Sequence, residues 1–122
     1  MLLFLSFSAV AVDDFYYKNN QKKELSFLGL TKTENNPIRL YKNENGITVG
    51  VSDQIIVKAI SFNVIQPYLK ELDIVLIKKL TNNLFLVKVQ NSHSTITIAN
   101  VLAKNKHIQY AQPNFIKTRV KR

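Results

Sequence analysis

The chain has 122 residues, of which 46% are apolar and 20% charged; this composition indicates one globular domain and excludes an intrinsically disordered chain. It contains no cysteine, which excludes disulfide bonds and cysteine-ligated metal ions. The net charge is +9 and every acidic residue precedes Ile74, so the surplus lies in the second half and indicates either an acidic partner (protein, membrane surface or nucleic acid) or a basic face that contacts only water.

Residues 1–11 have the features of a secretory signal peptide. The apolar run MLLFLSFSAVAV is too short to span a bilayer comfortably, and Ala9 and Ala11 have the spacing of small residues that a signal peptidase requires. No Lys or Arg precedes the run, and a buried N-terminal strand is the alternative interpretation. We expect a secreted or periplasmic protein that has no membrane contact once the signal is removed.

Residues 12–51 predict a β-rich lead-in. The stretch DDFYYKNNQKKELSF is typical of a strand pair across an Asn-rich turn, and we expect Tyr16 and Tyr17 to lie opposite Leu25 and Phe27. Further along, IRLYKN and ITVGV flank an Asn-Gly pair, which is among the strongest short-range hairpin signals.

Residues 52–116 predict an α+β domain, followed by a basic tail at 117–122. The apolar periodicity predicts strands at 54–59, 74–80, 84–89 and 107–111, and helices at 61–73 and 94–106. This β-α-β-β-α-β order predicts a ferredoxin-like antiparallel sheet with two helices on one face. Pro67 in the first helix and the β-branched run from Thr95 to Ile98 in the second oppose these assignments locally.

Strand alternation predicts that both faces of this sheet are apolar. If Val75 and Ile77 point toward the helices, as the alternation suggests, then the outer face collects Ile56, Leu76 and Leu86. Such a face is too apolar for a sheet that contacts only water. Either residues 12–51 cover it, or a partner docks on it, or both.

The sequence lacks the residue patterns of common catalytic sites. His93 and His107 are the only histidines, too few for a zinc site, and Ser92-His93-Ser94 has no nearby acid in sequence to orient the imidazole. The three glycines do not form a phosphate-binding loop. We therefore expect no enzymatic activity, no metal, no cofactor and no small-molecule substrate.

Several segments resemble one known family. The stretch IQYAQPN is similar to the V-x-Y-A-E-P-N strand and turn that ends the N-terminal prodomain of subtilisin-like serine proteases. DQIIVKA resembles the opening strand of that prodomain, and LTNNLFLVKV resembles its central hairpin. FYYKNNQKKELSF and RLYKNENGITVGVSDQIIVK are similar to stretches upstream of prodomains in bacterial subtilases of the fervidolysin type. The resemblance covers roughly residues 14–116.

This resemblance implies a non-catalytic protein that binds a subtilisin-like serine protease and inhibits it or assists its folding. The outer sheet face would dock on the protease, and the segment after the last strand would enter the active-site cleft. The implied docking residues are Ile56, Leu76, Leu86, Tyr110 and Gln112. The implied turn and tail residues are Pro113, Asn114, Phe115, Ile116, Arg119, Lys121 and Arg122.

The chain departs from the family in three respects. Gln112 stands where the family has a glutamate, the basic second half requires an acidic protease surface, and no catalytic segment follows within the 122 residues. The tail from Arg119 to Arg122 resembles a dibasic processing site that would place Arg122 in a specificity pocket, although a solvated basic tail explains it equally. The chain is then a stand-alone inhibitor, a separately encoded propeptide or the remnant of an interrupted gene.

Two other functions remain open at this point. A basic ferredoxin-like module could bind nucleic acid, but the outward residues expected on the central strands are aliphatic rather than aromatic, so we expect no nucleic-acid partner. The other alternative is a non-functional fragment of an interrupted protease gene, which folds without a partner.

Overall fold

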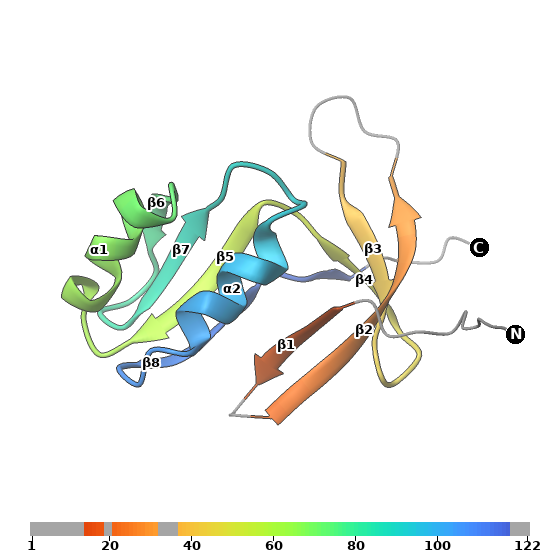
Figure 1. Cartoon of the computed structure of the whole chain (residues 1–122), viewed down its shortest axis with the longest axis horizontal. Coiled ribbons are helices and arrows are strands. Elements are labelled where there is room, and N and C mark those ends of the chain that lie inside the picture. The colour runs from red at the N-terminus through yellow and green to blue at the C-terminus, as the bar shows by residue number, and fades with distance from the viewer. Residues whose placement is uncertain (1–13, 19–20, 32–36, 118–122) are drawn as a thin grey trace, which may run out of the picture.

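The computed structural model describes residues 14–18, 21–31 and 37–117, which form an α+β structure of two antiparallel sheets and two helices (Figure 1). The elements in chain order are β1 (Asp14–Lys18), β2 (Gln21–Leu30), β3 (Arg39–Lys42), β4 (Thr48–Val51), β5 (Gln54–Ala59), α1 (Phe62–Glu71), β6 (Val75–Lys79), β7 (Leu84–Lys88), α2 (Thr95–Ala103), β8 (Ile108–Pro113) and β9 (Ile116–Lys117). The strand orders are β1-β2-β3-β4-β9 and β6-β7-β5-β8.

The first hairpin, β1–β2, forms where the sequence predicts it but in a different register. Tyr16 lies opposite Lys23 and Tyr17 opposite Lys22, so the expected pairing with Leu25 and Phe27 is wrong. The reason is the short connection between the strands. Lys18 pairs with Gln21, and this first pair determines the register of all the other pairs in the hairpin.

The β3–β4 hairpin confirms the Asn-Gly signal. Asn43 Oδ1 accepts hydrogen bonds from the backbone N–H groups of Asn45 (2.9 Å) and Ile47 (3.0 Å). Gly46 has φ +80°, a left-handed conformation that glycine adopts without steric cost. The turn thus brings Lys42 opposite Thr48 and fixes the register of the two strands.

The four strands and two helices predicted for residues 52–116 are all present, with ends shifted by a few residues, and the four strands form the second sheet. Helix α2 begins at Thr95 despite its β-branched start, because tertiary contacts outweigh the local preference. Thr95 is fully buried and its hydroxyl donates to the Ser52 carbonyl at 2.6 Å. In α1 the side chain of Pro67 is exposed, and the missing N–H forfeits one backbone bond without ending the helix.

Two hydrophobic cores hold the described residues together. The first lies between one face of the four-stranded sheet and both helices, and its fully buried members include Val57, Phe85, Ile65 and Leu102. The second lies inside the lead-in and is shared with the start of α2. Its buried members are Leu25, Tyr41, Val49, Val51 and Ile96, with Tyr16 and Phe115 packed against them.

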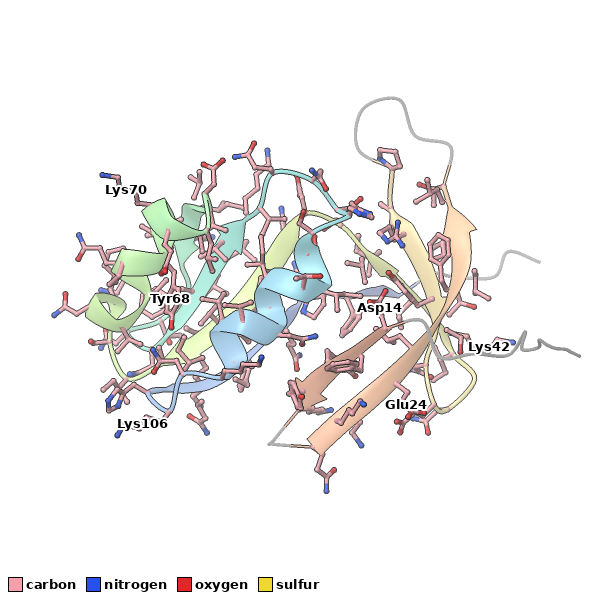
Figure 2. The ribbon with its side chains drawn as sticks, in the orientation of Figure 1. Asp14, Glu24, Lys42, Tyr68, Lys70 and Lys106 are labelled. Atoms are coloured by element: carbon pink, nitrogen blue, oxygen red, sulfur yellow. The ribbon has the colours of Figure 1, made fainter. Side chains whose placement is uncertain are left out.

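The five-stranded sheet lies beside the four-stranded one (Figure 1), and β1 contacts α2 and β8. Asn100 Nδ2 of α2 donates to the Phe15 carbonyl at 2.8 Å. Within the sheet, Arg39 Nε donates to Tyr41 Oη at 2.9 Å, and Tyr41 Oη donates to Asp14 Oδ2, also at 2.9 Å. Figure 2 shows Asp14 close to where the two sheets meet. The lead-in is therefore attached through α2 and β8.

The register of β6 overturns one sequence prediction. A bulge between Leu76 and Lys78 places Leu76 opposite Val87, so Leu76 packs into the first core. Val75 and Ile77 are instead 57% and 44% exposed, although alternation predicts that they point inward. The expected outer position of Leu76 is therefore wrong.

Candidate functional site

The outer face of the four-stranded sheet is built from three cross-strand rows. The strand registers place Gln54, Lys88 and Val75 in the first row, Gln112, Ile56, Leu86 and Lys78 in the second, and Tyr110, Lys58 and Leu84 in the third. We call these ten residues the outer face. Their neighbours along β5 and β7 (Ile55, Val57, Phe85 and Val87) are fully buried on the helix side. The alternation of each strand thus separates a closed core from an accessible face.

Four of the five predicted docking residues come together on this face. Ile56 pairs with both Leu86 and Gln112, and Tyr110 lies in the adjacent row beside Lys58. Leu76 is not among them, because the bulge in β6 turns it toward the helices. Sequence reasoning omitted Lys78 from the site, and no pattern within β6 announces the bulge that brings Lys78 opposite Leu86.

The lead-in leaves this face accessible. Ile56, Leu84 and Leu86 are half-buried although they lie on the two central strands, and Val75 at the edge is 57% exposed. The second core, to which the lead-in contributes, involves Ile96 and Phe115 and none of the outer-face residues. Of the two explanations for an apolar outer face, coverage by residues 12–51 does not apply to the residues that the structure describes.

The residues after β8 are attached to the domain rather than extending away from it. Pro113 is fully buried, and Asn114 donates to Gln54 twice, from its backbone N–H to the carbonyl (3.0 Å) and from Nδ2 to Oε1 (3.1 Å). Phe115 packs edge-to-face on Tyr16, with ring centroids 4.9 Å apart. Ile116 and Lys117 then form β9, an unpredicted strand.

Strand β9 pairs with β4, opposite Val49 and Gly50. A Cβ added at Gly50 would lie 2.8 Å from Ile38 Cγ2, so the close approach of Ile38 requires glycine, and it would lie in ordinary contact with Ile116 Cβ at 3.5 Å. The tail predicted to enter a cleft is thus fixed through Lys117. Arg119, Lys121 and Arg122, together with Ala9 and Ala11, lie outside the described residues.

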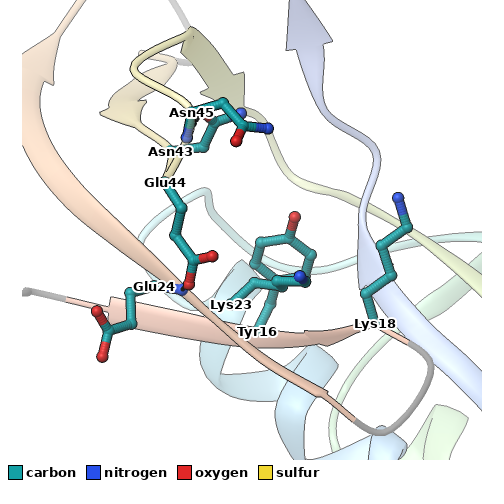
Figure 3. Close-up of a pocket in the computed structure, with 7 residues that line it drawn as sticks. All are labelled: Tyr16, Lys18, Lys23, Glu24, Asn43, Glu44 and Asn45. Carbon is teal, nitrogen blue, oxygen red and sulfur yellow. Dashed lines mark hydrogen bonds between the residues drawn. The ribbon is translucent and has the colours of Figure 1, made fainter.

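A separate polar pocket of about 200 Å³ lies between the β1–β2 hairpin and the β3–β4 turn (Figure 3). Its lining residues are Tyr16, Lys18, Lys23, Glu24, Asn43, Glu44 and Asn45. Glu44 Oε2 accepts the backbone N–H of Glu24 at 2.9 Å. Burial, and then the charge of Glu44, raise the pKa of Tyr16, which stays a neutral hydroxyl near pH 7. Two carboxylates balance two ammonium groups, so the pocket favours no particular ligand charge.

The segment Ser92-His93-Ser94 makes structural contacts. Ser92 Oγ donates to the Pro37 carbonyl at 2.8 Å, and Ser94 Oγ donates to Asn91 Oδ1 at 3.4 Å. His93 is exposed. Within the described ranges no group of three or more His, Cys, Asp or Glu residues is placed to hold a metal ion. In the same part of the chain, no helix has the length and apolar character needed to cross a membrane.

Comparison with known proteins identifies no relative: no family model, no curated protein and no solved structure matches this chain.

Proposed function

We propose that this chain is a prodomain-like protein that binds a subtilisin-like serine protease and inhibits it or assists its folding. The observation that carries the proposal is the accessible outer face, on which Ile56, Leu86 and Tyr110 lie in adjacent rows of a sheet closed by helices on its other side. An accessible apolar patch on a rigid sheet is a typical protein-docking surface.

The proposal includes a ferredoxin-like fold for residues 52–116. The β-α-β-β-α-β order of β5 to β8 supports it, as does the strand order β6-β7-β5-β8, in which each pair of neighbours is antiparallel. In this arrangement the last strand, β8, lies at an edge beside β5 and ends at Pro113.

In the proposed complex, the outer face docks on the protease and the tail enters its cleft. Because β9 pairs with β4, the part of the tail that reaches the cleft begins after Lys117, unless β9 separates. A prodomain that binds the folded protease but not its unfolded chain would stabilise the folded form by mass action, and this is how a bound prodomain assists folding. The proposed role needs no catalytic group, cofactor or small-molecule substrate of its own. In this proposal the chain acts outside the cytoplasm after its signal peptide has been removed.

A nucleic-acid role has less support. The outward side chains of the two central strands are Gln54, Ile56, Lys58, Leu84, Leu86 and Lys88, and none of them is aromatic. Sheet-based RNA recognition requires aromatic rings at such positions, so that the bases can stack.

The test is inhibition of a panel of subtilisin-like proteases, including members that cleave after basic residues, by the purified protein. A variant that ends at Lys117 keeps β9 and lacks residues 118–122, three of which are basic. We expect slow-binding inhibition by the whole chain and a weaker effect of the shortened one. Equal inhibition by both would show that the tail does not enter the cleft. A folded protein that inhibits no member of the panel would refute the proposed function.

A further inference from the structure

The lysines of the four-stranded sheet are distributed over its outer face. Lys88, Lys78 and Lys58 occupy the first, second and third row, on β7, β6 and β5 respectively. Adjacent strands are about 5 Å apart and successive residues on one face about 7 Å, so the three ammonium groups are spread over the width of the patch. Each lysine lies directly beside an apolar outer-face residue.

An acidic group opposes this positive charge at only one of the three lysines, Lys88, among the residues that the structure describes. The strands β5, β6, β7 and β8 contain no acidic residue along their whole length. The acidic partner of Lys88 is Asp53, just before β5, whose Oδ2 lies 3.8 Å from Lys88 Nζ. The side chain of Asp53 is only 10% exposed, whereas that of Lys88 is 51% exposed and reaches solvent. The face therefore presents net positive charge to a partner.

The apolar residues between the lysines decide which acidic partner fits. Ile56, Leu84, Leu86 and Val75 are aliphatic, and their burial requires a partner with a matching apolar centre. A nucleic-acid backbone supplies phosphates but no such centre, and aliphatic side chains offer no stacking surface for bases. A folded protein surface supplies both an apolar centre and carboxylates around it.

We propose that the outer face selects an acidic docking surface on its protein partner, in which an apolar centre is surrounded by carboxylates that meet Lys58, Lys78 and Lys88. This inference rests on the proposed function for the identity of the partner, a subtilisin-like protease. Charges at the rim of an interface contribute mainly to the rate of association and to the choice among partners, and less to the final affinity. The signature of the pairing is thus a salt-dependent association rate.

The experiment measures association and dissociation rates of the purified protein with each protease of the panel, at about 20 mM and about 500 mM salt, where screening is weak and strong. The test variant carries Lys58→Glu, Lys78→Glu and Lys88→Glu together. Its matched control has the same net charge and carries Lys70→Glu, Lys104→Glu and Lys106→Glu. Lys70 lies on α1 and Lys104 and Lys106 follow α2, so the control changes the helix side of the molecule (Figure 2).

We expect the wild-type association rate to be highest with proteases that have an acidic surface, and to fall at high salt. The outer-face variant is expected to associate about 10- to 100-fold more slowly at low salt, with little change in the helix-side control. Circular dichroism checks that both triple variants are folded. If the outer-face triple variant is not folded, the three single Lys→Glu variants of the outer face are measured instead, and each is expected to associate more slowly than the wild type.

The outcomes separate this inference from the proposed function. Association with a protease at a rate that the outer-face reversals leave unchanged would overturn the acidic-partner inference and leave the proposed function intact. If both triple variants associate equally slowly, the effect is due to net charge, and the acidic-partner inference is likewise overturned. If no protease associates, the proposed function fails and the inference with it. Binding of single-stranded RNA that is lost only in the outer-face variant would show that the face takes nucleic acid instead.

Discussion

Replacing Phe115 by alanine is expected to destabilise the whole lead-in, although Phe115 lies near the other end of the chain. Alanine in place of a fully buried phenylalanine costs about 3–5 kcal/mol. Phe115 is half-buried, but it also forms the edge-to-face contact with Tyr16. Such a contact adds about 1 kcal/mol. We therefore expect the free energy of unfolding to fall by about 2 kcal/mol, which for a domain of this size lowers the melting temperature by roughly 8 °C.

Thermal unfolding followed by circular dichroism measures this change, with Ile116→Ala as the control. Ile116 is the next residue and is 41% exposed, so its truncation is expected to cost about 0.5 kcal/mol. The same reasoning predicts that a chain ending at Asn114 melts well below one ending at Lys117, because only the shorter chain loses Phe115 and β9. If Phe115→Ala melts within about 2 °C of Ile116→Ala, the aromatic ring is not part of the second core and the reasoning is wrong.

Three further predictions concern the fold. Leu76→Ala is expected to lower the free energy of unfolding by about 2 kcal/mol, and Val75→Ala by less than about 0.5 kcal/mol, as measured by urea unfolding. A larger loss for Val75→Ala than for Leu76→Ala would instead support the register expected from alternation. Thr95→Val removes the hydroxyl that bonds the Ser52 carbonyl and is expected to cost about 1–2 kcal/mol in the same assay, whereas Thr95→Ser keeps that hydroxyl and should cost less. Burial, assisted by Asp14, raises the pKa of Tyr41 to about 12, so the unfolded chain loses this proton first and stability should fall between pH 10 and about 12. Melting temperatures over this range should show a smaller alkaline loss in Tyr41→Phe, and an identical loss in both proteins would contradict the assignment.

Periodicity predicts much of this fold because most segments show one unambiguous pattern. The run QIIVKA alternates cleanly, and the strand occupies the predicted residues Gln54 to Ala59. The helix at Thr95 is confirmed against its β-branched start, because Ala99 and Leu102 supply the buried stripe farther along. Local propensity alone would have assigned a strand there.

The errors arise where one residue changes the register. The bulge in β6 exchanges the faces of Val75 and Leu76, and the two-residue connection after Lys18 sets the pairing of the first hairpin. Neither is encoded by a recognisable pattern in the strand itself. Strand β9 could not be predicted for a related reason, because two residues are too few to show a period, and their pairing with β4 depends on tertiary contacts.

The pairing of β9 with β4 has a consequence for how the chain is made. Residues of the lead-in leave the ribosome before those of β9, yet their sheet and core remain incomplete until Phe115 and β9 have been synthesised. The bond between Asn100 and Phe15 joins residues 85 positions apart, and contacts over such separations form slowly. The lead-in therefore cannot complete its sheet and its core until residues 115–117 have been synthesised.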